Sequence, residues 1–428
     1  MLYFKGLILL VIATVSLAVS VLDPATLIIY DPKLTNLDDY SKLIDNLKKQ
    51  SYKLTIKQID DESIKLYKND EKLYQNVLIF PTKTRTIGSD ITGFKLLEFF
   101  NDGGDVFIIS NPNGLSESVR TFINQLGIFP SPRNHQLLDH FVYDETKAFE
   151  SHDVLKLNES NIVDQGAIIK NKVDSFNYKG SSALLGNGRL LIPVVQAPTT
   201  SFVKDLKNDD FVLENSWTVG TQGYLAVGFQ GMNNARAFWI GDEDLLNEDF
   251  AQDFIKWTFQ ETGVLKVTSV EHSHLDGRSY EETPYKIKDD VIYKIGVSEW
   301  DGSKWVPFIT DDLQVEIKLL DPYHRLNLKP ILTQGESTIY GVEFKLPDHH
   351  GVFSFHTNYR RSGKSFIDEK NTLAIRHLAN DEYPRSWDIT NSWVYITSAV
   401  VVFIAWVFFV VFFIYSTDET LVEAKKEK

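Results

Sequence analysis

The stretch from Trp393 to Tyr415 constrains this chain most strongly, because its 23 consecutive residues carry no charge. A helix of that length is about 34 Å long, which is enough to cross a hydrocarbon core of about 30 Å. The aromatic residues at its two ends suit the membrane–water interfaces. A buried helix of a soluble protein is the alternative, but only Thr397 and Ser398 could face water there. The run therefore predicts one transmembrane helix over 393–415.

The N-terminus follows the pattern of a secretory signal peptide over residues 1–20. Lys5 precedes an uncharged run from Gly6 to Leu22, and the small residues Ala18 and Ser20 suit a cleavage site after Ser20. The uncharged run is at the short limit for a membrane span, so we expect cleavage rather than an N-terminal anchor. One cleaved signal and one late span predict a single-pass type I membrane protein whose bulk is lumenal.

The tail, residues 416–428, ends in Lys425-Lys426-Glu427-Lys428. Lysines beside a span favour the cytosolic side of a membrane. Lys425 and Lys426 occupy the fourth and third places from the end, and they resemble the dilysine retrieval signal of endoplasmic reticulum membrane proteins. The alternative is that these lysines only stop the transfer of the chain across the membrane. We therefore predict residence in the endoplasmic reticulum membrane.

Composition excludes several classes of function. The chain has 58 acidic and 44 basic side chains, a formal net charge of −14, which opposes nucleic-acid binding by bulk electrostatics. It has no cysteine, so disulfides, thiolate catalysis and cysteine-ligated zinc are excluded. Aromatic residues make up 13% of the chain, and we expect their packing to supply much of its stability.

The region 21–263 alternates short apolar runs with segments of helical periodicity. Such alternation is typical of an α/β domain with a parallel sheet covered on both faces. The expected strands are 26–31, 77–80, 106–109, 224–229 and 235–240, and the expected helices lie around 37–47, 94–101, 116–126 and 248–260.

Beyond Gly263 the periodicity changes to short alternating runs without a convincing helix. Asp301-Gly302 is a strong hairpin signal between two of these runs. The pattern predicts an antiparallel, β-sandwich-like domain over 264–370, followed by a juxtamembrane segment over 371–392. The expected strands are 285–297, 305–309, 313–320, 325–328, 338–346 and 351–359.

The sequence contains no recognisable active-site motif. It contains no dinucleotide-binding glycine motif, no P-loop and no G-x-S-x-G nucleophile elbow. The plausible metal ligands are His272, His274, His349, His350 and His356, with Asp276 and Asp348 nearby in sequence. Zinc usually takes four ligands, and these histidines are spread over separate strands. We therefore expect no catalytic residue, no metal and no cofactor in this chain.

Two features indicate modification and partner binding instead. Asn158-Glu159-Ser160 is the only N-x-S/T sequon of the chain, which predicts an exposed loop that carries a glycan unless the triplet occurs by chance. The apolar run is rich in rings on several sides and has no ionisable group apart from tyrosines, so it does not suit a transport path. Trp406 and Phe409 are the candidate contacts with other membrane proteins.

Four long blocks of this sequence resemble one family. They are Asn124 to Pro132, Asn233 to Gly241, His272 to Gly302 and Ala374 to Trp387. In order and spacing they are similar to the Wbp/DDOST-type subunit of the oligosaccharyltransferase complex, in its fungal form. Fungal members of this family also end in a dilysine.

The resemblance implies a non-catalytic subunit of the enzyme that transfers a preassembled oligosaccharide from dolichyl diphosphate to Asn of N-x-S/T. It places catalysis and the divalent metal in a larger multi-span catalytic subunit, and a ribophorin-II-like subunit among the partners. It also implies that the first domain has a fold similar to class I glutamine amidotransferases, whose Cys nucleophile this chain lacks.

Two other functions stay open at this point. A free-standing type I lumenal lectin or cargo receptor has the same topology, but it would need a compact cluster of aromatics and carboxylates or a calcium site. A lumenal hydrolase on an amidotransferase-like fold is opposed by the absent Cys and the absent Ser elbow.

Overall fold

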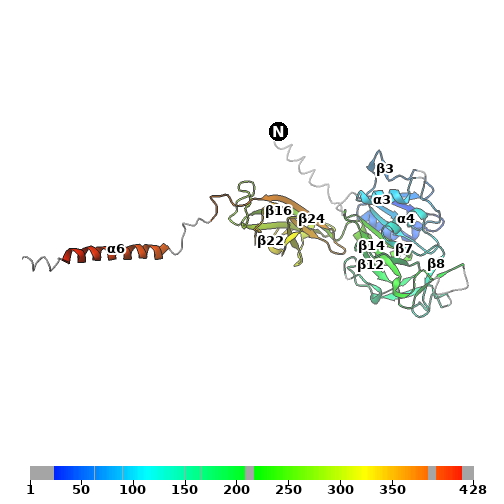
Figure 1. Ribbon diagram of the computed structural model, residues 1–428. Helices are drawn as coiled ribbons and strands as arrows, with labels where there is room; N and C mark the ends of the chain where they lie inside the picture. Colours follow the sequence, from blue (N-terminus) through cyan, green and yellow to red (C-terminus); the bar gives the residue numbers. More distant parts are fainter. Residues whose placement is uncertain are drawn as a thin grey trace, which may run out of the picture.

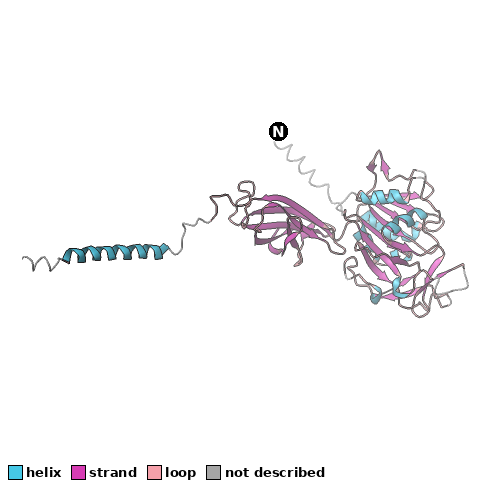
Figure 2. Cartoon of the chain, in the orientation of Figure 1, coloured by secondary structure: helices cyan, strands magenta, loops and turns pink. Residues whose placement is uncertain are grey.

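The computed structural model describes residues 24–383 and 392–416, apart from 62, 89, 150, 165 and 208–215. Two domains precede one long helix (Figure 1). The first domain mixes helices with strands, and the second is built from strands (Figure 2). The expected signal peptide and the lysines of the tail lie outside the described residues.

A mixed nine-stranded sheet forms the centre of the first domain. Its parallel part has the order β2-β1-β5-β6-β15, and β14, β11 and β7 extend it with antiparallel pairing, while β12 also pairs with β14. This confirms the predicted parallel core. The strands are β1 (Ala25–Tyr30), β2 (Lys53–Gln58), β5 (Asn76–Ile79), β6 (Asp105–Ile109), β7 (Ile128–Pro130), β11 (Ala183–Leu185), β12 (Leu191–Gln196), β14 (Tyr224–Gln230) and β15 (Arg236–Ile240).

Helices cover both faces of this sheet, as the alternation predicts. On one face Ile28 and its neighbours pack against α2 (Ser41–Lys49) and α5 (Ala251–Thr258). On the other face Leu27 and Ile29 pack with α3 (Gly93–Asn101) and α4 (Glu117–Gln125). Neighbouring residues of a strand point to opposite faces, so a strand buried on both sides is apolar throughout.

Short irregular strands fill the rest of the first domain, where the sequence gives no clear period. Runs of two to four residues are too short to show alternation. These strands are β3 (Tyr67–Lys68), β4 (Glu71–Lys72), β8 (His135–Leu138), β9 (Leu155–Asn158), β10 (Ser175–Tyr178) and β13 (Phe202–Asp205).

The second domain is an antiparallel β-sandwich, as predicted. One sheet has the order β16-β17-β22-β21 with β18 beside β17, and the other has the order β20-β19-β23-β24. Apolar side chains of both sheets form one shared core. The strands are β16 (Val264–His274), β17 (Asp290–Trp300), β18 (Trp305–Pro307), β19 (Gln314–Lys318), β20 (Pro322–Asn327), β21 (Lys329–Gln334), β22 (Ser337–Lys345), β23 (Gly351–Tyr359) and β24 (Ile367–Ile375).

Two boundaries differ from the sequence expectation. Strand β17 begins at Asp290, and the buried Tyr285 belongs to the loop before it. Strand β24 runs to Ile375, so the sheet continues into the segment expected to be juxtamembrane from 371. The middle of β24 is polar on both faces, because Glu369 and Asn371 stand at inward positions, so the apolar alternation that predicts a strand is interrupted. The Asp301-Gly302 hairpin is confirmed, with Trp300 opposite Trp305.

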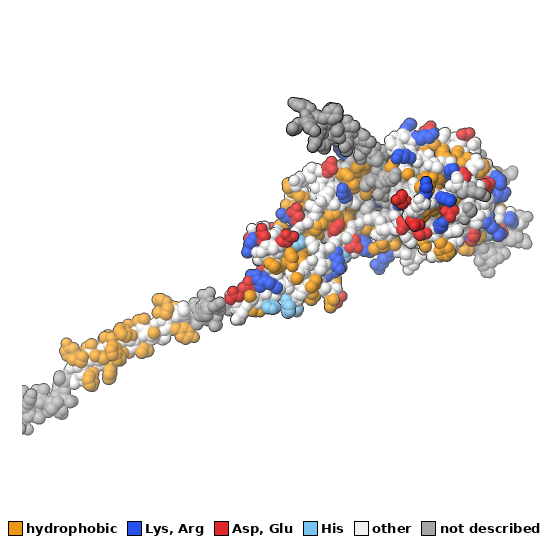
Figure 3. Space-filling model, turned by 90° about the horizontal axis from the view of Figure 1, so that it is seen from above, with side chains coloured by type: hydrophobic (Ala, Val, Ile, Leu, Met, Phe, Trp, Pro, Cys, Tyr) orange, Lys and Arg blue, Asp and Glu red, His pale blue; other side chains and the backbone are white. Residues whose placement is uncertain are grey.

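The helix α6 (Ser392–Tyr415) has 24 residues and is the one helix within the described residues that is long and apolar enough to span a membrane. Its most apolar window has a mean hydropathy of 2.7, and none of that window is buried in the chain. Hydrophobic side chains cover it in the space-filling view (Figure 3). The predicted span is thus a continuous helix with no protein surface of its own to cover it.

Candidate functional site

The carboxyl ends of the parallel strands are where an open α/β sheet usually places its ligands. Asp31 follows β1 here, Ser110 follows β6 and Asp242 lies just after β15. The carboxylate of Asp31 accepts hydrogen bonds from the backbone N–H groups of Lys33 and Lys83, both at 3.0 Å. The carboxylate at this edge therefore holds two loops together.

Asp242 is almost wholly buried at the same edge. Burial is the main cause that raises its pKa to about 7, although its carboxylate accepts from the backbone N–H groups of Lys179 at 2.7 Å and Asp244 at 3.0 Å. Both oxygens are therefore already used by the fold. The neighbouring hollow beside Ser110 and Ser181 has no room for a water-sized molecule. The edge is filled by its own polar contacts.

The paired histidines of β16 are held by neighbouring side chains. Asn371 Nδ2 donates to His272 Nε2 at 3.0 Å, so Nδ1 carries the proton and donates to the Tyr285 hydroxyl at 2.9 Å. Burial lowers the pKa of His272. His274 Nε2 lies 2.8 Å from the carbonyl oxygen of Thr283. These rings join β16 to the loop before β17 and to β24.

The remaining predicted ligands lie apart from that pair. His356 contacts Asp368 at 2.6 Å and Lys318 at 2.9 Å, and His349 contacts the Tyr323 hydroxyl at 3.2 Å. The rest are also engaged: His350 contacts the ring of His377, Asp276 pairs with Arg278, and Asp348 pairs with Lys288. Within the described ranges, the structure brings no three His, Asp or Glu side chains together as a metal site.

Asn158 is the last residue of β9, and its side chain is exposed. Its Oδ1 accepts from the backbone N–H of Ser160 at 3.1 Å and from the Ser160 hydroxyl at 2.5 Å. The sequon therefore forms a tight turn at the surface, which is accessible to modification. Glycosylation of Asn158 stays a prediction.

Trp406 and Phe409 lie one turn apart near the middle of α6, with 60% and 66% of their surfaces exposed. The Trp406 ring lies 6.1 Å from that of Phe403, and the Phe409 ring lies 6.1 Å from that of Phe413. Residues three and four apart share a helix face, so these four rings form a continuous ridge. This ridge is large, apolar and unpartnered within the described chain.

The first and second domains meet at a buried arginine. Arg236 begins β15, and its guanidinium donates to the carbonyl oxygens of Trp257 at 2.7 Å, Thr262 at 2.7 Å and Gly263 at 2.8 Å. Its planar group also lies over the ring of Trp257, 4.9 Å from the centroid. One side chain thereby ties the end of the first domain to the start of β16.

Two family models cover most of the chain. One, described as the OST48 N-terminal domain, matches residues 17–261, and another, the OST48 middle domain, matches residues 272–417. The chain belongs to the OST48 family. Between the two matches lies the passage from α5 to β16, which turns at Gly263 with a φ of +67°.

Several relatives agree with this membership over most of their length. The oligosaccharyltransferase subunit WBP1 of Saccharomyces cerevisiae is 42% identical over 401 residues, which cover 91% of this chain and 90% of that protein. The wbp1 subunit of Schizosaccharomyces pombe is 29% identical, with 82% and 83% covered. The 48 kDa subunit of Drosophila melanogaster is 29% identical, with 99% and 98% covered.

The interdomain residues are the structural feature that sequence reasoning missed in this OST48-family chain. Arg236 stands in an otherwise apolar strand, Arg-Ala-Phe-Trp-Ile. A charged residue at the start of a buried strand must find partners there, so Arg236 was the sequence feature that could have indicated this contact. The partners come from residues far along the chain, which no local pattern reveals.

Proposed function

We propose that this chain is an accessory, non-catalytic subunit of the oligosaccharyltransferase of the endoplasmic reticulum. That enzyme transfers a preassembled oligosaccharide from dolichyl diphosphate to Asn of N-x-S/T in nascent proteins. The observation that carries the proposal is the 42% identity, over nine-tenths of both chains, to a protein named as a subunit of that glycosyltransferase.

We propose further that the subunit acts in assembly and stability of the complex. Two features of the fold support this role. The polar groups at the carboxyl edge of the sheet are engaged with one another, as Asn111 Nδ2 donates to Glu243 at 3.1 Å and Thr35 donates to the same carboxylate at 3.2 Å. The ring-rich ridge of α6 offers a surface that other membrane helices can cover.

The multi-span catalytic subunit and a ribophorin-II-like subunit are the partners that we propose. The apolar span supports a membrane location, and the dilysine at Lys425 and Lys426 supports residence in the endoplasmic reticulum. In this topology the two folded domains are lumenal, as the transfer reaction on nascent chains requires. A type I orientation follows from one late span preceded by a cleaved signal.

Purification of the tagged full chain in mild detergent tests the proposal. We expect other oligosaccharyltransferase subunits in fixed stoichiometry, measured by quantitative mass spectrometry. The control is the detergent concentration at which the catalytic subunit stays in its own complex. If the chain is recovered alone at that concentration, the result favours a free-standing lectin or cargo receptor.

A further inference from the structure

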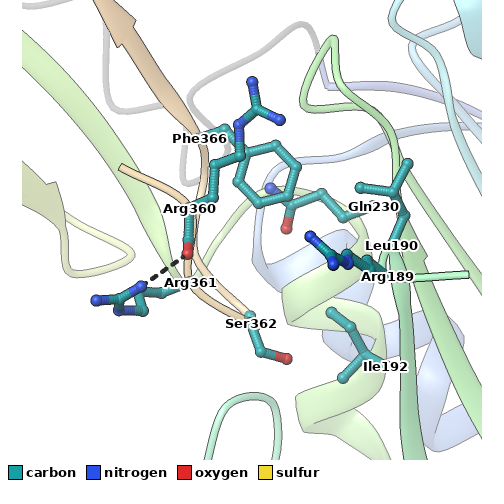
Figure 4. A pocket seen from close by; sticks show the side chains of 9 residues that line it. Arg189, Leu190, Ile192, Gln230, Arg360, Arg361, Ser362 and Phe366 are labelled. Carbon is teal, nitrogen blue, oxygen red and sulfur yellow. Dashed lines mark hydrogen bonds between the residues drawn. The ribbon is translucent and has the colours of Figure 1, made fainter. Parts of the chain in front are cut away.

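A cavity of about 320 Å³ opens where the first domain meets the second. The start of β12, the end of β14 and the loop between β23 and β24 form its walls (Figure 4). Cavities of this size are at the lower end of those that hold ligands. Its lining residues are Arg189, Leu190, Ile192, Gln230, Arg360, Arg361, Ser362, Gly363 and Phe366.

The lining carries three arginines and no acidic side chain. Arg361 is already used, because it pairs with Asp312 at 2.5 Å. Arg189 makes no hydrogen bond or ion pair with the described residues. Arg360 has weak partners: the carboxylate of Asp368 at 3.7 Å, Met232 Sδ at 3.6 Å and the ring of Phe366, whose centroid lies 6.0 Å away. Arg189 and Arg360 come from the two different domains (Figure 4). The cavity therefore has one cation at its rim without a described partner, Arg189, and a second with only weak partners, Arg360.

Gln230 supplies a second, independent indication of a ligand. It is 1% exposed, and its Nε2 donates to the carbonyl oxygen of Lys364 at 2.8 Å and to Asn234 Oδ1 at 3.2 Å. These two acceptors fix the orientation of the amide, which leaves Oε1 without a hydrogen-bond partner among the described residues. A buried acceptor without a donor is unfavourable, and a ligand that brings an N–H group into the cavity would relieve this.

The cavity also has an apolar part. Leu190, Ile192 and the ring of Phe366 line the cavity beside the arginines and the amide. Inorganic phosphate would use the guanidinium groups but would leave the apolar lining and the Gln230 acceptor without a partner. A sugar presents many hydroxyl groups, whereas the side chains of this lining offer no carboxylate and Gln230 Oε1 as their one unpartnered buried acceptor among the described residues. An anion, an N–H donor and an aliphatic group together are what an acidic peptide presents.

We propose that this interdomain cavity binds a polypeptide segment in which an Asp or Glu stands beside an aliphatic residue. The carboxylate pairs with Arg189 and Arg360, a backbone N–H donates toward Gln230 Oε1, and the aliphatic side chain packs on Leu190 and Phe366. This site is separate from the span and from the carboxyl edge of the sheet, and the proposal does not depend on the enzyme complex to which the chain belongs.

Titration calorimetry on the purified full chain in detergent tests the site. The probe is acetyl-Ala-Leu-Glu-Leu-Ala-amide, and its control is the same peptide with Gln in place of Glu. We expect the Glu peptide to bind and the Gln peptide to bind about tenfold more weakly. Arg189→Ala and Arg360→Ala should each weaken binding of the Glu peptide about tenfold, the usual effect of losing one charge-assisted contact.

Arg325→Ala is the matched control, because Arg325 pairs with Glu316 on β19, away from the cavity. It should leave binding unchanged. Should the single variants unfold, the double change Arg189→Glu and Arg360→Glu in a folded chain should instead bind the peptide with Lys. The proposal is overturned if the Glu peptide does not bind at millimolar concentration. It is also overturned if the arginine variants bind that peptide as well as the unmodified chain does, or if only inorganic phosphate binds.

Discussion

The indole nitrogen of Trp257, on α5 of the first domain, donates to the carbonyl oxygen of Gly363 at 2.9 Å, in the β23–β24 loop of the second domain. Gly363 has a φ of +77°, a conformation that favours glycine. A Cβ atom there would also collide with the backbone carbonyl of Ala167 in the first domain. The two domains thus meet through a backbone position that has no room for a side chain.

Replacement of Gly363 by Ala should destabilise the folded chain by about 2–5 kcal/mol, because strain in the left-handed region adds to overpacking. Gly335→Ala is the matched control, since Gly335 has a φ of +58° but no described atom lies within 4 Å of the place that a Cβ would take. It should cost only about 1–2 kcal/mol. Chemical unfolding of the full chain in detergent measures both, and equal losses would contradict the tight interdomain contact.

Acidity should stabilise part of the first domain. Burial raises the pKa of Asp105 to about 7, against 3.8 as its ordinary value, although the backbone N–H of Arg236 donates to it at 2.7 Å. Between those two pH values the folded chain holds a proton that the unfolded chain has released. This contribution to the free energy of unfolding is therefore complete below about pH 4 and is lost as the pH rises to about 7.

The variant Asp105→Asn removes that titration and keeps the acceptor for Arg236. Between pH 5 and pH 7 its free energy of unfolding should fall less than that of the unmodified chain, by up to about 2 kcal/mol. Unfolding titrations at both pH values measure the difference. The same pH dependence in both proteins would show that Asp105 is not the group responsible.

The fold could be predicted from sequence where local patterns are long. Apolar runs such as 106–109 and the alternation of 351–359 correspond to β6 and β23 within one residue at each end. Strand β24 was not predicted because Glu369 and Asn371 make two of its inward positions polar. Strand β21 was not predicted because all six of its residues are exposed at a sheet edge. A strand with no buried face carries no periodic signal.

The cavity between the domains could not be predicted, because its residues are distant in sequence. Arg189 and Arg360 are 171 positions apart, and each stands in a loop with no distinctive pattern. The histidines show that spacing can also indicate a site that the fold does not form. His272 and His274 have a spacing that could suit a metal, but in the structure their rings contact Asn371 and Thr283. Residue type and spacing give candidates, whereas the tertiary contacts decide among them.

The ring ridge of α6 should bind a partner helix. We expect Trp406→Asn or Phe409→Asn to reduce co-purification of the other membrane subunits, because a polar amide replaces a large apolar contact surface. The apolar window of α6 is not buried against the two folded domains, which should therefore keep their unfolding transition. Val411→Asn is the control, because Val411 lies on the opposite side of the helix. If all three variants leave the complex intact, α6 is only an anchor.

The C-terminal lysines should act as a retrieval address. Replacement of Lys425 and Lys426 by Ser removes two charges and leaves the span and the folded domains untouched. When the chain is expressed without its partners, we expect part of it to reach later compartments, which glycan processing and microscopy would report. In the full complex other subunits should mask the effect. Unchanged residence of the unpartnered variant would mean that the lysines only flank the span.

We expect this subunit to act through assembly and to supply none of the reacting groups. The measurement that tests it most directly is the rate of oligosaccharide transfer, divided by the amount of catalytic subunit recovered in the assembled complex. For His272→Ala and His349→Ala we expect this normalised rate to stay unchanged, with any loss of total activity tracking loss of complex. A drop of about 100-fold in the normalised rate, the size expected when a positioned charge stabiliser is lost, would contradict the account and place chemistry in the second domain.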